Sequence, residues 1–263
     1  MKDKNNPNLP NDTHWSEKAV QIPELIKEIN SIEAARDLQL KYRKSLYTME
    51  SGSAETMFNI DKINLIAGID VSYFVQDNEE WGIACVMLWD LMTFKVVQRT
   101  FYQDKVSFPY KLGFLGFREV PLMAKAILKL STKPDIILTD GHGIIHPYRF
   151  GEAVHLGYAL NIPSIGIAKK PFIGFIENDT EFKTKGLKSP IWDSKKINER
   201  ELLGYKICLS DGLKAVYLSI GYKINIELAL ELALRTSTSH KQPEPLFLAH
   251  YFATEKIREL RGE

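Results

Sequence analysis

The most constraining feature of this sequence is the stretch PDIILTDGHGIIHPYRFG at residues 134–151, where a short apolar run ends in an acidic residue. The run Ile136–Leu138 is too short for a helix and leads into Asp140 and a Gly-rich turn, which is the pattern of a buried strand. In an open α/β sheet, binding and catalytic groups gather beyond the carboxyl ends of strands. Asp140 is therefore a candidate for catalysis or metal binding.

The elements around Asp140 form a β-α-β unit. The sequence predicts a strand at 135–140, a helix at about 149–161 and a strand at 164–169. Strands joined through a helix within one sheet are parallel, because the crossover must pack the helix back onto the sheet. This unit indicates an α/β fold.

Three strand-like runs precede the unit, at 65–74, 81–91 and 94–103, and short polar turns separate them. Such spacing predicts an antiparallel three-stranded meander. Together with the parallel strands it predicts a mixed sheet flanked by helices, within a single domain over residues 21–263. Residues 1–20 carry little periodic pattern and are interpreted as a tail that could be disordered.

Helical spacing of apolar residues predicts the covering helices. One is expected over 23–49, with an interruption near Ser31, and another is expected to begin near Glu119, with Pro121 tolerated in its first turn. The remaining expectations are helices at 224–235 and 245–260, short strands at 172–176, 205–209 and 215–221, and a charged surface excursion at 178–198.

Composition excludes little. The net charge of +1 argues against a grossly basic nucleic-acid binder but allows a local basic groove. Cys85 and Cys208 lie in apolar runs and are interpreted as buried thiols. The chain has no apolar leader and no run long enough to span a membrane, so we expect a soluble cytoplasmic protein.

Two further carboxylates lie at informative positions. Asp70 interrupts an apolar strand two residues after Gly68, which leaves space for a ligand or another backbone; the alternative is a solvated strand face. Glu119 lies near a helix start, where the helix dipole alone could explain it. Asp70, Glu119 and Asp140 together would suit Mg²⁺, and two such ions could activate a water for phosphodiester cleavage.

With Asp70, PYKLGFLGFRE at 109–119, TDGHGIIHPYRFG at 139–151 and IPSIGIAKK at 162–170, the chain resembles the endonuclease V family over about residues 32–250. The resemblance implies a ribonuclease-H-like fold. It also implies a Mg²⁺- or Mn²⁺-dependent nuclease that cuts the second phosphodiester bond on the 3′ side of a deaminated base, chiefly inosine. Asp70, Glu119 and Asp140 would then occupy the metal-binding positions.

The resemblance assigns substrate contacts as well. Tyr110, within the wedge segment 109–112, would fill the gap left by a flipped nucleotide. Lys169 would lie near the scissile phosphate and neutralise developing charge. The other implied contacts are Gly113 and Gly151 beside the flipped base, His146 near the base or phosphates, and Arg118, Arg149 and, more weakly, Lys170 on backbone phosphates, while His142 is equally well explained as a buried structural histidine.

Three residues depart from the family pattern. Tyr222 stands where the bacterial pattern has a histidine that completes the metal site, and a neutral phenol is a poorer ligand. Leu112 replaces the second proline of the wedge. Glu152 replaces a small aliphatic that lines the base pocket, and its carboxylate could alter base choice or repel the phosphates.

Three functions remain open from the sequence. The first is an active inosine-directed endonuclease on DNA or RNA. The second is an inosine-binding protein whose catalysis is impaired because Tyr222 replaces histidine. The third is a related nuclease that cuts junctions or flaps. We expect nucleic acid as the partner, no membrane, and a monomer.

Overall fold

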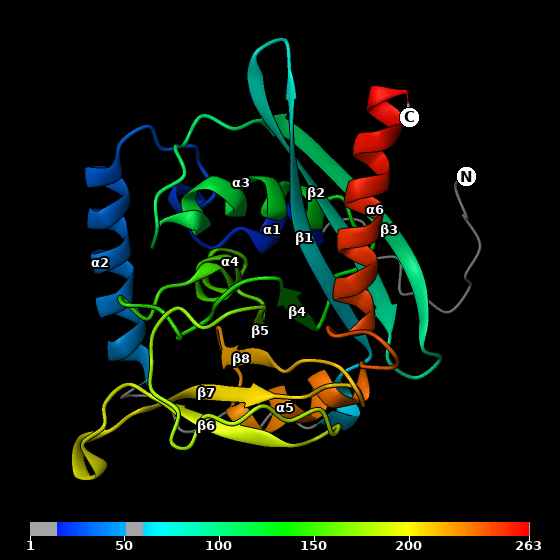
Figure 1. Cartoon of the computed structure of the whole chain (residues 1–263). Coiled ribbons are helices and arrows are strands. Elements are labelled where there is room, and N and C mark those ends of the chain that lie inside the picture. Colours follow the sequence, from blue (N-terminus) through cyan, green and yellow to red (C-terminus); the bar gives the residue numbers. More distant parts are fainter. Residues whose placement is uncertain (1–14, 51–59, 263) are drawn as a thin grey trace.

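The structure is a computed structural model that describes residues 15–50 and 60–262. Its centre is an eight-stranded mixed sheet in the order β3-β2-β1-β4-β5-β8-β7-β6. Figure 1 shows the sheet running from the long β1–β3 strands to the β6–β7 pair. The strands are β1 Leu65–Gln76, β2 Glu79–Asp90, β3 Lys95–Lys105, β4 Ile136–Thr139, β5 Ser164–Ala168, β6 Lys188–Trp192, β7 Leu202–Ile207 and β8 Val216–Ile220.

Helices cover both faces of the sheet (Figure 1). Helices α3 and α4 pack on one face, whereas α5 and α6 pack on the other. No helix in the described part of the chain is both long and apolar enough to cross a membrane. The helices are α1 Trp15–Ala19, η1 Pro23–Leu25, α2 Ile32–Glu50, η2 Ile60–Lys62, α3 Leu115–Ile127, α4 Glu152–Leu160, η3 Ile197–Glu199, α5 Ile226–Arg235 and α6 Glu244–Arg261.

The predicted fold class is confirmed. β1, β2 and β3 form the expected antiparallel meander, and the two-residue turn between β1 and β2 places Asp77 and Asn78 at positive φ, as a tight hairpin requires. β4 pairs in parallel with both β1 and β5, and α4 connects β4 to β5. The β-α-β unit therefore lies at the centre of the sheet.

Alternation along β1 divides its side chains between the two layers. Ala67, Ile69 and Val71 pack toward α3 and α4, whereas Ile66 packs toward α5 and the start of α6. Gly68 lies on this second face, where a Cβ atom would be only 2.3 Å from the carbonyl carbon of Pro245. The space left by this glycine therefore admits another backbone, the first turn of α6.

Several boundaries differ from the sequence predictions. α3 begins at Leu115, so Pro121 lies inside the helix and Glu119 lies in its second turn. The expected strand at 172–176 is reduced to one bridge from Phe175 to Trp192, and the expected surface excursion contains strand β6. The interruption near Ser31 is confirmed, since the Ser31 hydroxyl accepts a hydrogen bond from the Ala34 amide at the start of α2.

The N-terminal segment and the two cysteines complete this comparison. Residues 1–14 of the expected tail lie outside the described residues, but α1 is packed: the Trp15 indole donates a hydrogen bond to the Leu130 carbonyl at 3.0 Å. The interpretation of residues 15–20 as a tail is therefore wrong. Cys85 and Cys208 are buried, free thiols, as predicted.

The close approach at Gly68 predicts the cost of a methyl group there. We expect Gly68→Ala to lower the free energy of unfolding by about 3 kcal/mol, because Cβ would collide with the backbone of Pro245 and Leu246. Gly186→Ala is the control: it has open space but a φ of +86°, so only backbone strain of about 1 kcal/mol is expected. Equal losses for the two variants in denaturant unfolding would contradict this account.

His155 predicts part of the acid sensitivity of the fold. Its Nε2 lies 2.8 Å from the Leu25 carbonyl, and burial lowers its pKa to about 4. Because the folded pKa is below the unfolded value, stability is present above about pH 6.5 and is lost as the pH falls toward 4. We expect wild type to lose about 2 kcal/mol more than His155→Gln between pH 7 and pH 5 in denaturant unfolding. The same dependence of unfolding free energy on pH in both proteins would contradict this role of His155.

Candidate active site

Two of the expected carboxylates meet through the parallel pairing of β1 and β4. Ile69 on β1 is paired with Thr139 on β4, so Asp70 and Asp140 occupy the next positions on neighbouring strands. Asp70 is buried, and its carboxylate lies 2.8 Å from His250 Nδ1. Asp140 accepts a hydrogen bond of 2.5 Å from the Lys169 ammonium group at the end of β5.

The other two carboxylates come from helices. Glu119 on α3 is buried and accepts a hydrogen bond of 2.7 Å from the Tyr73 hydroxyl. Glu152, the first residue of α4, is 4% exposed and hydrogen-bonded to Glu119. A Cβ atom at position 141 would collide with Glu152 Oε2, so Gly141 makes room for this carboxyl. Glu119 lies beyond the first turn of α3, so the dipole of that helix does not explain it. Glu152 is the residue that lies at a helix N-terminus, that of α4.

Burial and mutual repulsion raise the proton affinity of this cluster. The pKa of Glu119 is raised chiefly by burial and further by Asp70 and Asp140. The pKa of Asp140 is raised by burial and then by Asp70, while Lys169 acts in the opposite direction. The pKa of Glu152 is raised well above its ordinary value by burial and then by Glu119. Glu152 is therefore the member of the Glu119 pair that we expect to keep a proton.

The donor set fits a hard divalent cation. Carboxylate oxygens are the ligands that Mg²⁺ prefers, and the repulsion among these buried carboxyls is what a bound cation would relieve. Oε1 of Glu152 is buried without a hydrogen-bond partner. Within residues 15–50 and 60–262, however, no three His, Cys, Asp or Glu side chains already converge as a preformed metal site. Lys169, His250 and Tyr73 hold the carboxylates in their present positions.

His250 is the site residue that the sequence predictions missed. It lies on α6, and the approach of that helix to Gly68 brings its imidazole to Asp70, 180 residues away in the chain. Hydrogen bonding to Asp70 raises the pKa of His250. The only sequence signal was Gly68 itself, since a glycine within a strand marks close backbone approach.

Tyr222 lies away from the carboxylates. Its ring packs on Tyr158 with the centroids 5.3 Å apart, and its hydroxyl lies 3.4 Å from Asn161 at the far end of α4 from Glu152. The rise of a helix over nine residues separates the two ends of α4 by about 14 Å. The histidine beside the carboxylates is therefore His250. Because Tyr222 lies elsewhere, its replacement of a histidine gives no reason to expect impaired metal binding.

The histidines after β4 stabilise loops. Nδ1 of His146 accepts a hydrogen bond from the Tyr148 amide, so Nε2 is the nitrogen that donates to the Gly113 carbonyl at 3.1 Å. Burial lowers the pKa of His146 to about 4. His142 packs 5.8 Å from Phe172, and its Nδ1 is buried without a partner. Through Gly113, His146 ties the loop of 109–113 to the loop of Asp140.

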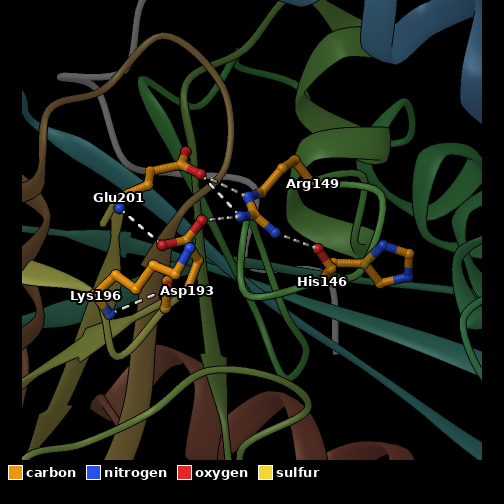
Figure 2. A network of polar contacts seen from close by, with 6 residues as sticks. His146, Arg149, Asp193, Lys196 and Glu201 are labelled. Carbon is orange, nitrogen blue, oxygen red and sulfur yellow. Dashed lines mark hydrogen bonds and ion pairs between the residues drawn. The ribbon is translucent and has the colours of Figure 1, made fainter. Parts of the chain in front are cut away.

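The two arginines expected on phosphates are engaged within the protein. Arg118 is buried, donates to the Phe108 carbonyl and pairs with Glu80. Arg149 donates to Glu201 at 2.8 Å and to Asp193 at 3.3 Å, as Figure 2 shows. Both guanidinium groups therefore already have acidic partners.

The remaining residues expected to contact the substrate are either exposed to solvent or packed against the chain. Tyr110 is 72% exposed and Leu112 is 67% exposed, so the wedge segment presents apolar side chains to solvent. Gly151 is packed against the chain, because a Cβ atom there would be 2.3 Å from the His142 carbonyl oxygen. Lys170 is exposed beside Lys169. The segment expected to form the wedge is therefore exposed to solvent, whereas Gly151 serves loop packing.

Comparisons with known proteins show the family of this chain. A family model described as Endonuclease V matches residues 49–251. The endonuclease V of Dictyoglomus thermophilum is 35% identical over 202 residues, 76% of this chain and 84% of that protein. The crystal structure of endonuclease V from Bacillus subtilis covers 90% of this chain and 97% of its own, with a TM-score of 0.78 at 25% identity.

A further structure shares the fold. Endonuclease V from Ciona intestinalis, in complex with a 24mer DNA containing an inosine followed by a ribo-adenosine, has a TM-score of 0.70 at 22% identity. The alignment covers 87% of this chain and 98% of that chain.

The positions of His250 and Tyr222 predict opposite results for metal binding. We expect His250→Ala to weaken Mn²⁺ binding about tenfold in titration calorimetry, because Asp70 loses the group that orients it. Tyr222→Phe keeps the packing on Tyr158 and removes only the hydroxyl contact, so its Mn²⁺ affinity should equal that of wild type. Weaker Mn²⁺ binding by Tyr222→Phe together with unchanged binding by His250→Ala would contradict this account and indicate that Tyr222 contributes to the metal site.

Proposed function

Because this chain belongs to the endonuclease V family of nuclease hydrolases, we propose that it cleaves the second phosphodiester bond on the 3′ side of inosine in DNA or RNA. The observation that carries the proposal is that Asp70 and Asp140 occupy neighbouring positions on the paired strands β1 and β4, with the buried Glu119 of α3 near enough for both to raise its pKa. The Ciona intestinalis relative bound to inosine-containing DNA supports inosine as the recognised base.

Mg²⁺ or Mn²⁺ is the proposed cofactor, and Asp70, Glu119 and Asp140 would hold it. When bound, the metal supplies an activated water and stabilises the charge on the leaving oxygen. The protein's own contribution is to fix these carboxylates: Tyr73 holds Glu119, His250 holds Asp70 and Lys169 holds Asp140. Burial keeps bulk water away from the carboxyl groups of Asp70 and Glu119.

Lys169 has a second proposed role. Its side chain is 46% exposed although its ammonium group pairs with Asp140, so it can also face a substrate phosphate. A compact ammonium group there would neutralise negative charge that grows during cleavage. Lys169 thus links the carboxylates to the nucleic-acid backbone.

The exposed loop supplies the proposed wedge. Tyr110 projects into solvent beside Gly113, whose carbonyl is fixed by His146 and by Gln39. An aromatic ring on a loop fixed at its base can replace the stacking that a flipped nucleotide loses. We therefore retain Tyr110 and Gly113 as substrate contacts, whereas Arg118, Arg149 and Gly151 are better explained by their internal contacts.

A paired cleavage assay tests this function. With Mg²⁺ or Mn²⁺, labelled single strands of DNA and RNA containing one inosine should be cut, and undamaged and branched strands should not. Asp140→Asn should lower the rate at least about a thousandfold, because it removes a charged ligand of the ion. The control is Asp135→Asn, since Asp135 caps the start of β1 at the opposite end of β4. Equal cleavage of branched undamaged substrates would favour the junction nuclease.

A further inference from the structure

A pocket of about 120 Å³ opens beside the carboxylates, on the side of β5, β8 and β7. We call it the lysine pocket, because five lysines line it. Its walls come from the end of β5, from the segment between β5 and β6, from β7, from β8 with the segment before it, and from the segment between α5 and α6. The lysines are Lys169, Lys183, Lys206, Lys214 and Lys241.

Strand register builds the floor of the lysine pocket. Ala168 pairs with Tyr217, and Tyr217 pairs with Lys206, so these positions form one row across β5, β8 and β7. Lys169 follows Ala168 and leaves the sheet at the same edge. The pocket therefore belongs to the same rigid sheet as Asp140, and Lys169 is a wall that it shares with the carboxylate cluster.

The lysine pocket has an excess of positive charge. Lys169 is paired with Asp140, and Lys206 donates to Asp179 at 2.5 Å. The other three lysines of the pocket, in the part of the chain that the structure describes, have no carboxylate within 4 Å. The pocket contains a single acidic side chain, Glu181.

Lys241 is a lysine of the pocket whose pKa responds to this positive charge. The pKa of Lys241 is lowered by its burial and also by Lys169 and Lys214. Like charges held together in this way are stabilised by an anion between them. The pocket is thus built for a negatively charged group.

We propose that the lysine pocket binds a phosphate of the substrate backbone next to the one that is cleaved. This inference rests on the proposed nuclease function, because the strand must run from Asp140 past the shared Lys169 into the pocket. The volume favours a phosphate over a whole nucleoside, since pockets for small organic ligands are typically about 300 Å³ or larger. Lysine ammonium groups act as point charges that attract phosphate without reading a base.

A charge-neutralising double variant tests the proposal. Lys183→Gln/Lys214→Gln removes two exposed charges that make no ion pair, so folding should be unaffected. The matched control is Lys95→Gln/Lys133→Gln, which removes two exposed lysines on β3 and before β4, away from the pocket. Binding of a single strand with one inosine is measured by fluorescence anisotropy in EDTA, between 50 and 300 mM salt, where cleavage does not interfere.

The expected result is a loss of affinity with a weaker salt dependence. The pocket variant should bind about tenfold less tightly at 150 mM salt, and the slope of log K against log salt should fall by about 1. A strand with one neutral methylphosphonate linkage beside the scissile bond should bind wild type less tightly and the pocket variant no less tightly than the normal strand. Equal affinity and slope for pocket and control variants would overturn the proposal.

Two further arms separate the possible failures. An undamaged single strand is titrated in parallel, because a phosphate contact does not depend on base identity. A reduced slope on both strands without inosine-specific cleavage would refute the proposed function and leave the pocket supported. Inorganic phosphate is the second probe: if it stabilises wild type but not the pocket variant in thermal unfolding, while strand binding is the same for both, the pocket binds a small anion and the proposal is wrong.

Discussion

Repulsion among buried carboxylates is the constraint around which this fold is arranged. Asp70 and Asp140 lie on adjacent parallel strands, and Glu119 and Glu152 approach them from two helices. Buried charges of one sign are costly, so each needs a donor or a proton. The structure supplies a tyrosine, a histidine and a lysine from three separate elements. The packing of α6 on β1 is what brings the histidine.

The sequence predicted the sheet well because local patterns determine it. Alternation and apolar runs identify β1 to β5, and the crossover rule then makes β4 and β5 parallel. It predicted the start of α3 poorly, because a proline favours the first turn of a helix, whereas Pro121 lies inside α3. His250 could not be found by pattern, because its relation to Asp70 depends on how α6 packs on the sheet.

The basic residues show a second limit of sequence interpretation. Arg118 and Arg149 had the right type and place in the motifs to hold phosphates, yet acidic partners brought by folding already engage both. Lys183 and Lys214 carried no motif, but folding gathers them around one pocket. Neither feature can be inferred from the net charge of +1, because only the spatial distribution of charge determines where an anion can bind.

The three residues expected to depart from the family pattern have unequal chemical weight. Leu112 is exposed on the wedge, and Tyr222 packs among aromatic rings at the far end of α4, so neither changes the charge near Asp140. Glu152 instead adds a further titratable carboxyl group to the cluster, because its carboxyl is buried against Glu119 and one of its oxygens has no partner. A departure matters for chemistry when its side chain enters the field of the reacting groups. By that criterion the relevant departure is Glu152, and not Tyr222, because Glu152 places a carboxyl group where an aliphatic side chain is expected.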